Sequence, residues 1–252
     1  MTKREVIGRY RGSVLGILWS FFNPLLMLTV YTLVFSVALK ARWNVGADGG
    51  TASKAEFAII LFAGLIAYGF FSECVNRASS LVLSNVNYVK KVVFPLEILP
   101  WVSIGAALFH AAISLCVLLL FYLLVNHSLQ WTAVFVPLVL LPLILLTVGV
   151  AWFLSALGVY LRDVGQTVGL LTTALMFLSP IFYPLAALPE NYRPLLMLNP
   201  LSYLIEETRN VMIFGRSPNW SMLCFYVVGS ALAAWLGFAF FQKSRKGFAD
   251  VL

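Results

Sequence analysis

Charged residues are scarce in this sequence. Only 11% of its 252 residues are Asp, Glu, Lys or Arg, whereas 61% are hydrophobic; a typical soluble domain carries about 25% charged residues. A water-soluble core of this size cannot bury so much apolar surface, so most of that surface must face lipid or neighbouring membrane helices. The scarcity of charge therefore excludes an ordinary soluble protein and predicts an all-α integral membrane protein.

Motifs of common catalytic sites are also missing. The chain has no GxxxxGK[ST] phosphate loop, no HExxH or CxxC motif, and no pair of carboxylates suited to hydrolysis. Its three cysteines, Cys74, Cys116 and Cys224, show no metal-ligand or redox spacing and are interpreted as packing residues. We therefore predict no enzyme, no metal and no cofactor in this chain, and an enzyme acting on lipid-linked sugars lacks a credible site.

Six apolar runs are long enough to cross a bilayer, because a spanning helix needs about 20 apolar residues. They cover residues 19–39, 57–75, 98–125, 133–157, 164–183 and 220–241 of a single transmembrane domain, 1–252. With six spans, the loops on the side of the termini hold Lys3, Arg4, Arg9, Arg11, Arg77, Lys90, Lys91, Arg162, Lys243, Arg245 and Lys246. The opposite loops hold only Lys40, Arg42, Lys54, Arg193, Arg209 and Arg216. This asymmetry predicts that both termini are cytoplasmic, and the scattered basic residues do not suggest nucleic-acid binding.

The predicted spans contain little charge. The first, third, fourth and sixth have no Asp, Glu, Lys or Arg in their cores. Ion-coupled transporters commonly place such groups near the bilayer midplane, so a self-contained channel or ion-coupled transporter is a weaker hypothesis. Glu73 and Arg77, four residues apart near a span end, are expected to pair with each other. His110 is expected to be a hydrogen-bonded packing residue, with a proton relay as the alternative.

The first segment that does not fit a simple span is residues 1–18. Apolar residues there, such as Val6, Ile7 and Tyr10, follow helical spacing and predict an amphipathic helix lying in the membrane interface, although a basic topogenic tail is the alternative. Gly8, Gly12 and Gly16 recur every four residues, a spacing that permits close approach of another helix.

Residues 76–97 form a long loop between the second and third spans, on the cytoplasmic side. Ser84, Asn85 and Asn87 offer capping groups, and Pro95 should end any helix that they begin. We predict a short projecting helix over residues 84–94, whose apolar stripe is expected to have a partner.

Residues 184–217 are rich in proline, with Pro180 just before them and Pro184, Pro189, Pro194 and Pro200 within them. A continuous spanning helix cannot form there. Because the segment is still strongly apolar, we predict two short re-entrant helices that dip into the membrane from the outer side. The polar face of the second is expected to carry Glu206, Glu207 and Arg209.

Three stretches resemble the membrane subunit of type-2 ABC exporters. They are RYRGSVLGILWSFFNPLL at residues 9–26, YVKKVVFPLEILP at 88–100 and LNPLSYLIEETRN at 198–210. They are most similar to the branch that exports O-antigen, teichoic acid and related polysaccharides, and their order and spacing cover the chain from end to end.

The resemblance implies a bacterial inner-membrane homodimer with one pore. Each copy would dock a nucleotide-binding subunit, which would hold ATP and Mg, and the complex would export an undecaprenyl-linked glycan. A drug, haem or small-lipid carrier of the same class is the alternative.

The resemblance also implies roles for residues. ATPase coupling would involve Asn85, Asn87, Tyr88, Lys90, Lys91, Phe94 and Glu97. The interface helix at the entrance would use Arg4, Arg9, Tyr10, Arg11 and Trp19. The candidate pore-lining aromatics are Phe22, Tyr31, Phe35, Phe177 and Tyr183. The outer gate would include Pro184, Pro189, Asn199, Pro200, Glu206, Glu207 and Arg209.

Overall fold

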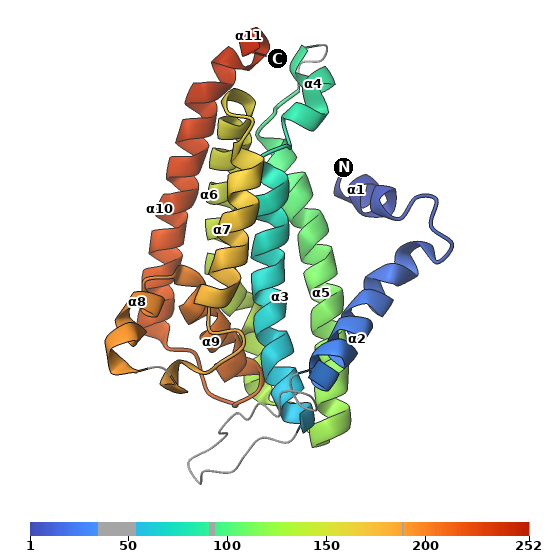
Figure 1. Cartoon of the computed structure of the whole chain (residues 1–252), viewed down its shortest axis with the longest axis vertical. Coiled ribbons are helices and arrows are strands. Elements are labelled where there is room, and N and C mark those ends of the chain that lie inside the picture. The colour runs from blue at the N-terminus through green and yellow to red at the C-terminus, as the bar shows by residue number, and fades with distance from the viewer. Residues whose placement is uncertain (35–53, 91–93, 188, 252) are drawn as a thin grey trace.

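The structure is a computed structural model that describes residues 1–34, 54–90, 94–187 and 189–251. Phe35 and Lys91, predicted for the pore and for ATPase coupling, lie outside the described residues, as does the side chain of Lys90. The regular elements in the described ranges are all helical, and the long helices stand roughly side by side in one bundle (Figure 1). The predicted all-α class is therefore confirmed for this part of the chain.

Five helical stretches in the described part are long and apolar enough to cross a membrane: Gly16–Val34, Ala55–Ala78, Ile98–Asn126, Trp131–Tyr160 and Trp220–Val251. They contain α2 (Trp19–Tyr31), α3 (Lys54–Ala78), α5 (Ile98–Asn126), α6 (Val136–Tyr160, preceded by η4, Trp131–Phe135) and α10 (Trp220–Ser244). The fifth predicted span, residues 164–183, corresponds to α7 (Val164–Leu178), which has only 15 residues. It ends early because Ser179 has extended backbone angles and Pro180 follows it, and proline cannot continue the hydrogen-bond pattern of a helix.

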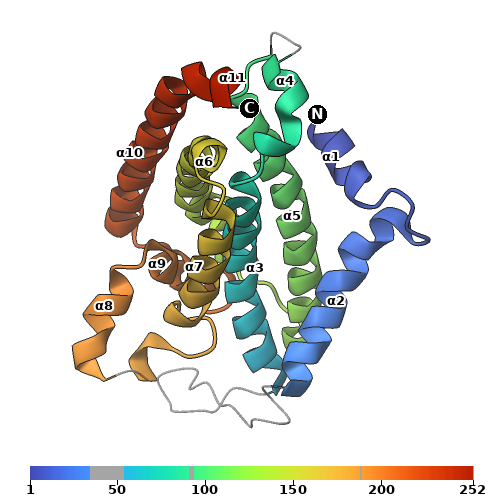
Figure 2. The ribbon, with the colours of Figure 1, turned by 45° about the horizontal axis from the view of Figure 1, so that its top comes forward.

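Helix α3 lies at the centre of the bundle (Figures 1 and 2). In its most apolar stretch 78% of the residues are buried, against 11–39% in the other four candidate spans. Helices α6 and α10 pack closely along one side, where a Cβ atom on Gly237 would lie 2.1 Å from the carbonyl oxygen of Gly149. Only glycine permits such an approach of two helix backbones.

The N-terminal segment does not form the continuous helix predicted over residues 1–18. Helix α1 (Thr2–Arg9) ends at Arg9, and η1 (Gly16–Leu18) leads into α2. Gly12 and Gly16 have φ angles of +88° and +52°, a region that favours glycine, so they turn the chain. Apart from their own chain neighbours and helix backbone, no described atom lies within 4 Å of a Cβ built on Gly8, Gly12 or Gly16, so no second helix of the described chain approaches them closely.

Short helices lie at both ends of the bundle. At the end that carries both termini, η3 (Leu83–Asn85) and α4 (Val86–Lys90) project beside η7 (Arg245–Gly247) and α11 (Phe248–Val251), as Figure 1 shows. At the other end lie η5 (Leu185–Ala187), η6 (Glu190–Tyr192), α8 (Arg193–Met197) and α9 (Pro200–Met212). Helix α9 packs against α3 and α6 and is largely buried.

Candidate functional site

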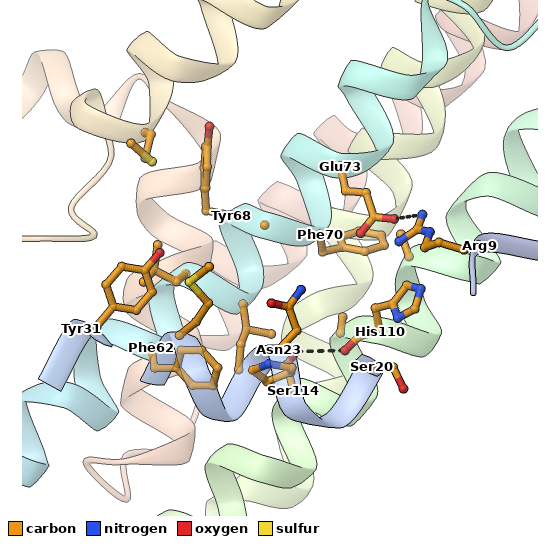
Figure 3. Close-up of a pocket in the computed structure, with 18 of the residues that line it drawn as sticks. Arg9, Ser20, Asn23, Tyr31, Phe62, Tyr68, Phe70, Glu73, His110 and Ser114 are labelled. Carbon is orange, nitrogen blue, oxygen red and sulfur yellow. Dashed lines mark hydrogen bonds and ion pairs between the residues drawn. The ribbon is translucent and has the colours of Figure 1, made fainter. Parts of the chain in front are cut away.

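A cavity of about 380 Å³ lies between α2, α3 and α5, and Met176 of α7 also lines it. It forms because α2 contacts α3 and α5 near its C-terminal end and leans away from the bundle toward η1 (Figure 1). The walls combine aromatic and polar side chains (Figure 3). Tyr31, Phe62, Tyr68 and Phe70 contribute rings, and Arg9, Tyr10, Ser20, Asn23, Glu73, His110 and Ser114 contribute polar groups. Such a lining suits a ligand that offers both hydroxyl groups and apolar faces.

Arg9, the last residue of α1, and the adjacent Tyr10 line the polar end of the cavity. Arg9 Nη2 lies 2.5 Å from Glu73 Oε1, and Arg77 forms a second ion pair with Glu5. These four residues, which we call the N-terminal clamp, tie α1 to α3. The prediction that Glu73 and Arg77 pair with each other is therefore wrong. Each of them instead pairs with a residue of α1, because that helix folds back beside the bundle.

Helix α1 also touches α5. A Cβ atom on Gly105 would lie 2.8 Å from Thr2 Cγ2, so a glycine is needed where the start of α1 abuts α5. The Tyr10 hydroxyl lies 3.3 Å from His110 Nδ1, which fits the prediction of a hydrogen-bonded histidine. Burial raises the pKa of the Tyr10 phenol above its ordinary value, so Tyr10 acts here as a neutral hydrogen-bonding group.

The clamp region keeps unused hydrogen-bonding capacity. Arg77 Nη1 and His110 Nε2 are buried atoms without a hydrogen-bond partner among the described residues. The side chains of Glu5, Arg9, Glu73 and Arg77 are 29–38% exposed. Where water reaches side chains this exposed, each ion pair contributes at most about 1 kcal/mol. The clamp can open at low cost, and its free groups can bind hydroxyl-rich or anionic ligands.

The predicted pore aromatics divide into two groups. Tyr31 lines the cavity, whereas Phe22 packs edge-on against Phe21 and is 46% exposed. Phe177 is 61% exposed on α7, and the Tyr183 hydroxyl donates a hydrogen bond to its carbonyl oxygen. These residues are not brought together with the cavity.

Sequence reasoning missed the aromatic residues of α3. Phe62, Gly69 and Glu73 recur at helical spacing and share the cavity-lining face with Tyr68 and Phe70. A signal was available, because this face ends in Glu73, an acidic residue within a predicted span.

The predicted entrance residues around the clamp remain accessible. Arg4 and Arg11 are exposed, and Trp19 is 44% exposed at the start of α2. Only Arg9 and Tyr10 of this group reach the cavity.

The predicted coupling residues lie on and beside α4. Tyr88 stacks on Phe94, with ring centroids 4.7 Å apart, while Asn87 is exposed. The Asn85 amide donates a hydrogen bond back to Leu81 O over 2.8 Å. Glu97 forms an ion pair of 2.9 Å with Arg245, and its carbonyl accepts a hydrogen bond from Trp152 Nε1.

The predicted outer gate is organised by one buried cation. Arg209 is 1% exposed and donates hydrogen bonds to the carbonyl oxygens of Ile60 (2.9 Å), Pro180 (2.5 Å) and Ile181 (2.8 Å). The Pro180 and Ile181 carbonyls follow the end of α7, where no helix continues to satisfy them. Burial lowers the pKa of Arg209 to about 10, with Glu206 acting in the opposite direction, so Arg209 stays charged at neutral pH. It joins α9, α3 and the end of α7.

Other predicted gate residues cap helices. Asn199 Oδ1 accepts a hydrogen bond from Leu201 N at the start of α9, and its amide donates to Ser179 Oγ. Glu207 accepts a hydrogen bond from the backbone N–H of Asn219, which precedes α10.

The predicted gate prolines lie at the starts of short elements. Pro200 occupies the first position of α9, where its missing N–H costs nothing. Pro184 and Pro189 border the short turns η5 and η6.

Sequence comparison now identifies the family. Residues 1–213 match the family described as "ABC-2 type transporter". The chain belongs to this family. It is 30% identical to the O-antigen export system permease protein RfbA of Myxococcus xanthus, over 99% of this chain and 93% of that protein. It is 26% identical to an RfbA of Klebsiella pneumoniae, over 100% and 93% of the two chains. It is 25% identical to the polysialic acid transport protein KpsM of Escherichia coli, over 96% and 91%.

These matches confirm the resemblance to type-2 ABC exporters and make the chain a multi-pass membrane permease. A permease needs a path through its helices, so the cavity between α2, α3 and α5 is the candidate for part of that path. In the part of the chain that the structure describes, no group of three or more His, Cys, Asp or Glu residues could hold a metal ion.

Proposed function

We propose that this chain is the membrane subunit of an ATP-driven exporter that moves a lipid-linked polysaccharide across the bacterial inner membrane. The observation that carries this proposal is similarity over nearly the whole chain to permeases named for O-antigen and polysialic acid transport. The working unit would be two copies of the chain with two nucleotide-binding subunits, which hold ATP and Mg. The substrate would be an undecaprenyl-linked glycan, and both termini would be cytoplasmic.

The cavity is the proposed half-path for the glycan. Its rings, including Tyr31, Phe62 and Tyr68, can stack on the apolar faces of sugars, and Asn23 and Ser114 can hydrogen-bond hydroxyl groups. Contacts of this kind are individually weak and repeated, which suits a polymer that must keep moving. A single tight site would stop it.

The energy would enter at α4. Closure of the ATPase subunits would shift α4, and the movement would reach α1 through α3, which carries Glu73 and Arg77 of the clamp. Release of the clamp would open the polar end of the cavity. The outer gate would open when α9 moves relative to α7 and α3, the elements that Arg209 links.

A block experiment tests the proposed function. Deleting this subunit in its native host should accumulate undecaprenyl-linked polymer in the cytoplasm, and restoring the chain should clear it. Phe62→Ala, within the cavity, should restore export less well than Phe225→Ala, whose ring is 71% exposed on α10. Unchanged polymer export together with altered tolerance to drugs or haem would instead support a small-molecule exporter.

A further inference from the structure

The C-terminal residues do not project freely from α10. After Ser244 the chain turns through η7, and α11 then lies against α4 and α6 (Figures 1 and 2). We call residues 245–251 the C-terminal brace. In the sequence, Arg245 and Lys246 served only to predict the orientation of the chain in the membrane. The contact of α11 with α4 suggests that the brace also supports α4.

The brace is held by a buried ring. Phe248 is 0% exposed, and its ring centroid lies 5.6 Å from that of Phe241 and 6.0 Å from that of Tyr160. The hydrophobic cluster that contains Phe248 is also the one against which Tyr88 and Phe94 pack. The brace and the coupling residues therefore share one core.

Polar contacts fix the start of the brace as well. Arg245 Nη1 lies 2.9 Å from Glu97 Oε2, and the Tyr160 hydroxyl donates a hydrogen bond to Ser244 O over 2.8 Å. The predicted coupling residues run from Asn85 to Glu97, and we call this stretch the coupling segment. Glu97 directly precedes α5, so the ion pair connects the brace to the C-terminal end of the coupling segment. Both ends of that segment, α4 and Glu97, thus contact the C-terminal residues.

Helix α4 needs such support. Only five residues, Val86–Lys90, are helical in its described part, and a helix this short is not stable in water without tertiary contacts. The brace supplies some of these contacts and leaves Asn87 exposed toward the surroundings. The supported face and the free face of α4 are therefore distinct.

We propose that the C-terminal brace holds α4 in the orientation in which it engages the nucleotide-binding subunit. Phe248 and Arg245 are then positioning residues that act through α4. This inference rests on the proposed function, because it assumes that α4 is the coupling helix.

The test uses the complex of the full chain with its ATPase subunit. Phe248→Ala should lower export and transport-coupled ATP hydrolysis about fivefold or more, the lower end of typical coupling between sites. Val251→Ala, a substitution at a side chain 51% exposed in the same helix, should behave like the parent. Equal export and hydrolysis in both variants would overturn the proposal.

Charge reversal distinguishes positioning from general damage. Arg245→Glu and Glu97→Arg should each reduce coupling, and the double variant should recover it, whereas Lys246→Glu should have no effect. Failure of the double variant to recover any coupling would contradict a role for the ion pair.

A milder variant serves if Phe248→Ala does not assemble. A Cβ atom on Gly247 would lie 2.7 Å from the Tyr160 hydroxyl, so Gly247→Ala should displace the brace without removing a core ring. Gly229→Ala is the matched control, because no other part of the described chain lies within 4 Å of a Cβ added there. Coupling as strong in Gly247→Ala as in this control would also count against the brace.

Asn87→Trp separates the two proposals, because it adds bulk to the free face of α4. If this variant still binds the ATPase and exports polymer, α4 is not the coupling helix; the proposed energy input at α4 and the brace inference then both fail, while polymer export itself stands. If it blocks coupling while the brace variants match their controls, only the brace inference is wrong.

Discussion

Replacing Arg209 with methionine should destabilise the protein strongly. The change removes the donor for three carbonyl oxygens, those of Ile60, Pro180 and Ile181. An unsatisfied buried acceptor costs about 1–3 kcal/mol, but relief from burying the guanidinium offsets part of that sum. Three such acceptors together would cost about 3–9 kcal/mol, and after this offset we expect Arg209→Met to lose about 3–5 kcal/mol.

Arg209→Lys should lie between the parent and Arg209→Met. Lysine keeps the positive charge, but its compact ammonium cannot reproduce the planar fork that reaches α3 and the end of α7 together. We expect a cost of about 2 kcal/mol for this variant, because at least one charge-assisted hydrogen bond is lost.

Thermal unfolding of the purified protein in detergent measures these effects, with the seven tryptophans as the fluorescent probe. A loss of about 3–5 kcal/mol corresponds to a drop in Tm of roughly 6–20 °C for a chain of this size. The control is Arg216→Met, since Arg216 is exposed and lies 5.9 Å from the Phe214 ring centroid. A Tm for Arg209→Met within about 2 °C of that control would refute the reasoning.

A double-mutant cycle sharpens the test. A Cβ atom on Gly64 would lie 2.6 Å from Arg209 Nη2, so Gly64→Ala should push the guanidinium out of its carbonyl site. Its effect should be largely absent when Arg209 is already methionine, because the displaced group is gone. Additive losses would mean that Gly64 acts through a different contact.

Three further predictions follow from other contacts. Exchanging the clamp charges singly, as Arg9→Glu or Glu73→Arg, should reduce export while changing stability by at most about 1 kcal/mol, and the double variant should recover export in the polymer assay. Gly237→Ala should lower stability by about 1–3 kcal/mol because α6 and α10 must separate, whereas Gly229→Ala should not, as thermal unfolding would reveal. Tyr68→Phe removes a buried 2.5 Å hydrogen bond to Thr172 O and should cost about 0.5–1.5 kcal/mol in the same measurement, with the ring left in the cavity.

Hydrophobic run length predicted the long helices because it depends on local composition alone. Four predicted spans, beginning near residues 57, 98, 133 and 220, correspond to α3, α5, α6 and α10. The fifth was drawn too long, since α7 stops before Pro180 although apolar residues continue to Tyr183. Proline and backbone geometry decided that boundary, and hydropathy did not.

Charge pairing could not be predicted from spacing. Glu73 and Arg77 satisfy the i,i+4 rule on α3, but α1 returns beside that helix and offers each a partner, Arg9 and Glu5. The return depends on positive φ angles at Gly12 and Gly16, a backbone feature for which the regular glycine spacing suggested a different role. The i,i+4 rule is valid for an isolated helix, but here the tertiary contacts with α1 decide which charges pair.

The burial of Arg209 could not be predicted from the sequence either. Its place beside Glu206 and Glu207 suggested a polar face on a short helix, yet its side chain is 1% exposed. The carbonyl oxygens that attract it are those left without helical partners where α7 ends. A sequence does not reveal which carbonyls remain unsatisfied, because that depends on the packing of three separate elements.

The two ends of the bundle are held by interactions of very different strength. At the end that carries the termini, the clamp consists of ion pairs about a third exposed, each contributing at most about 1 kcal/mol. At the other end, Arg209 is fully enclosed and joins three elements through carbonyl oxygens. A force that enters at α4 would therefore open the clamp before it disturbs the gate segment. We accordingly expect the cavity to admit substrate at the α1 end first, while the contacts by which Arg209 joins α9, α3 and the end of α7 remain intact.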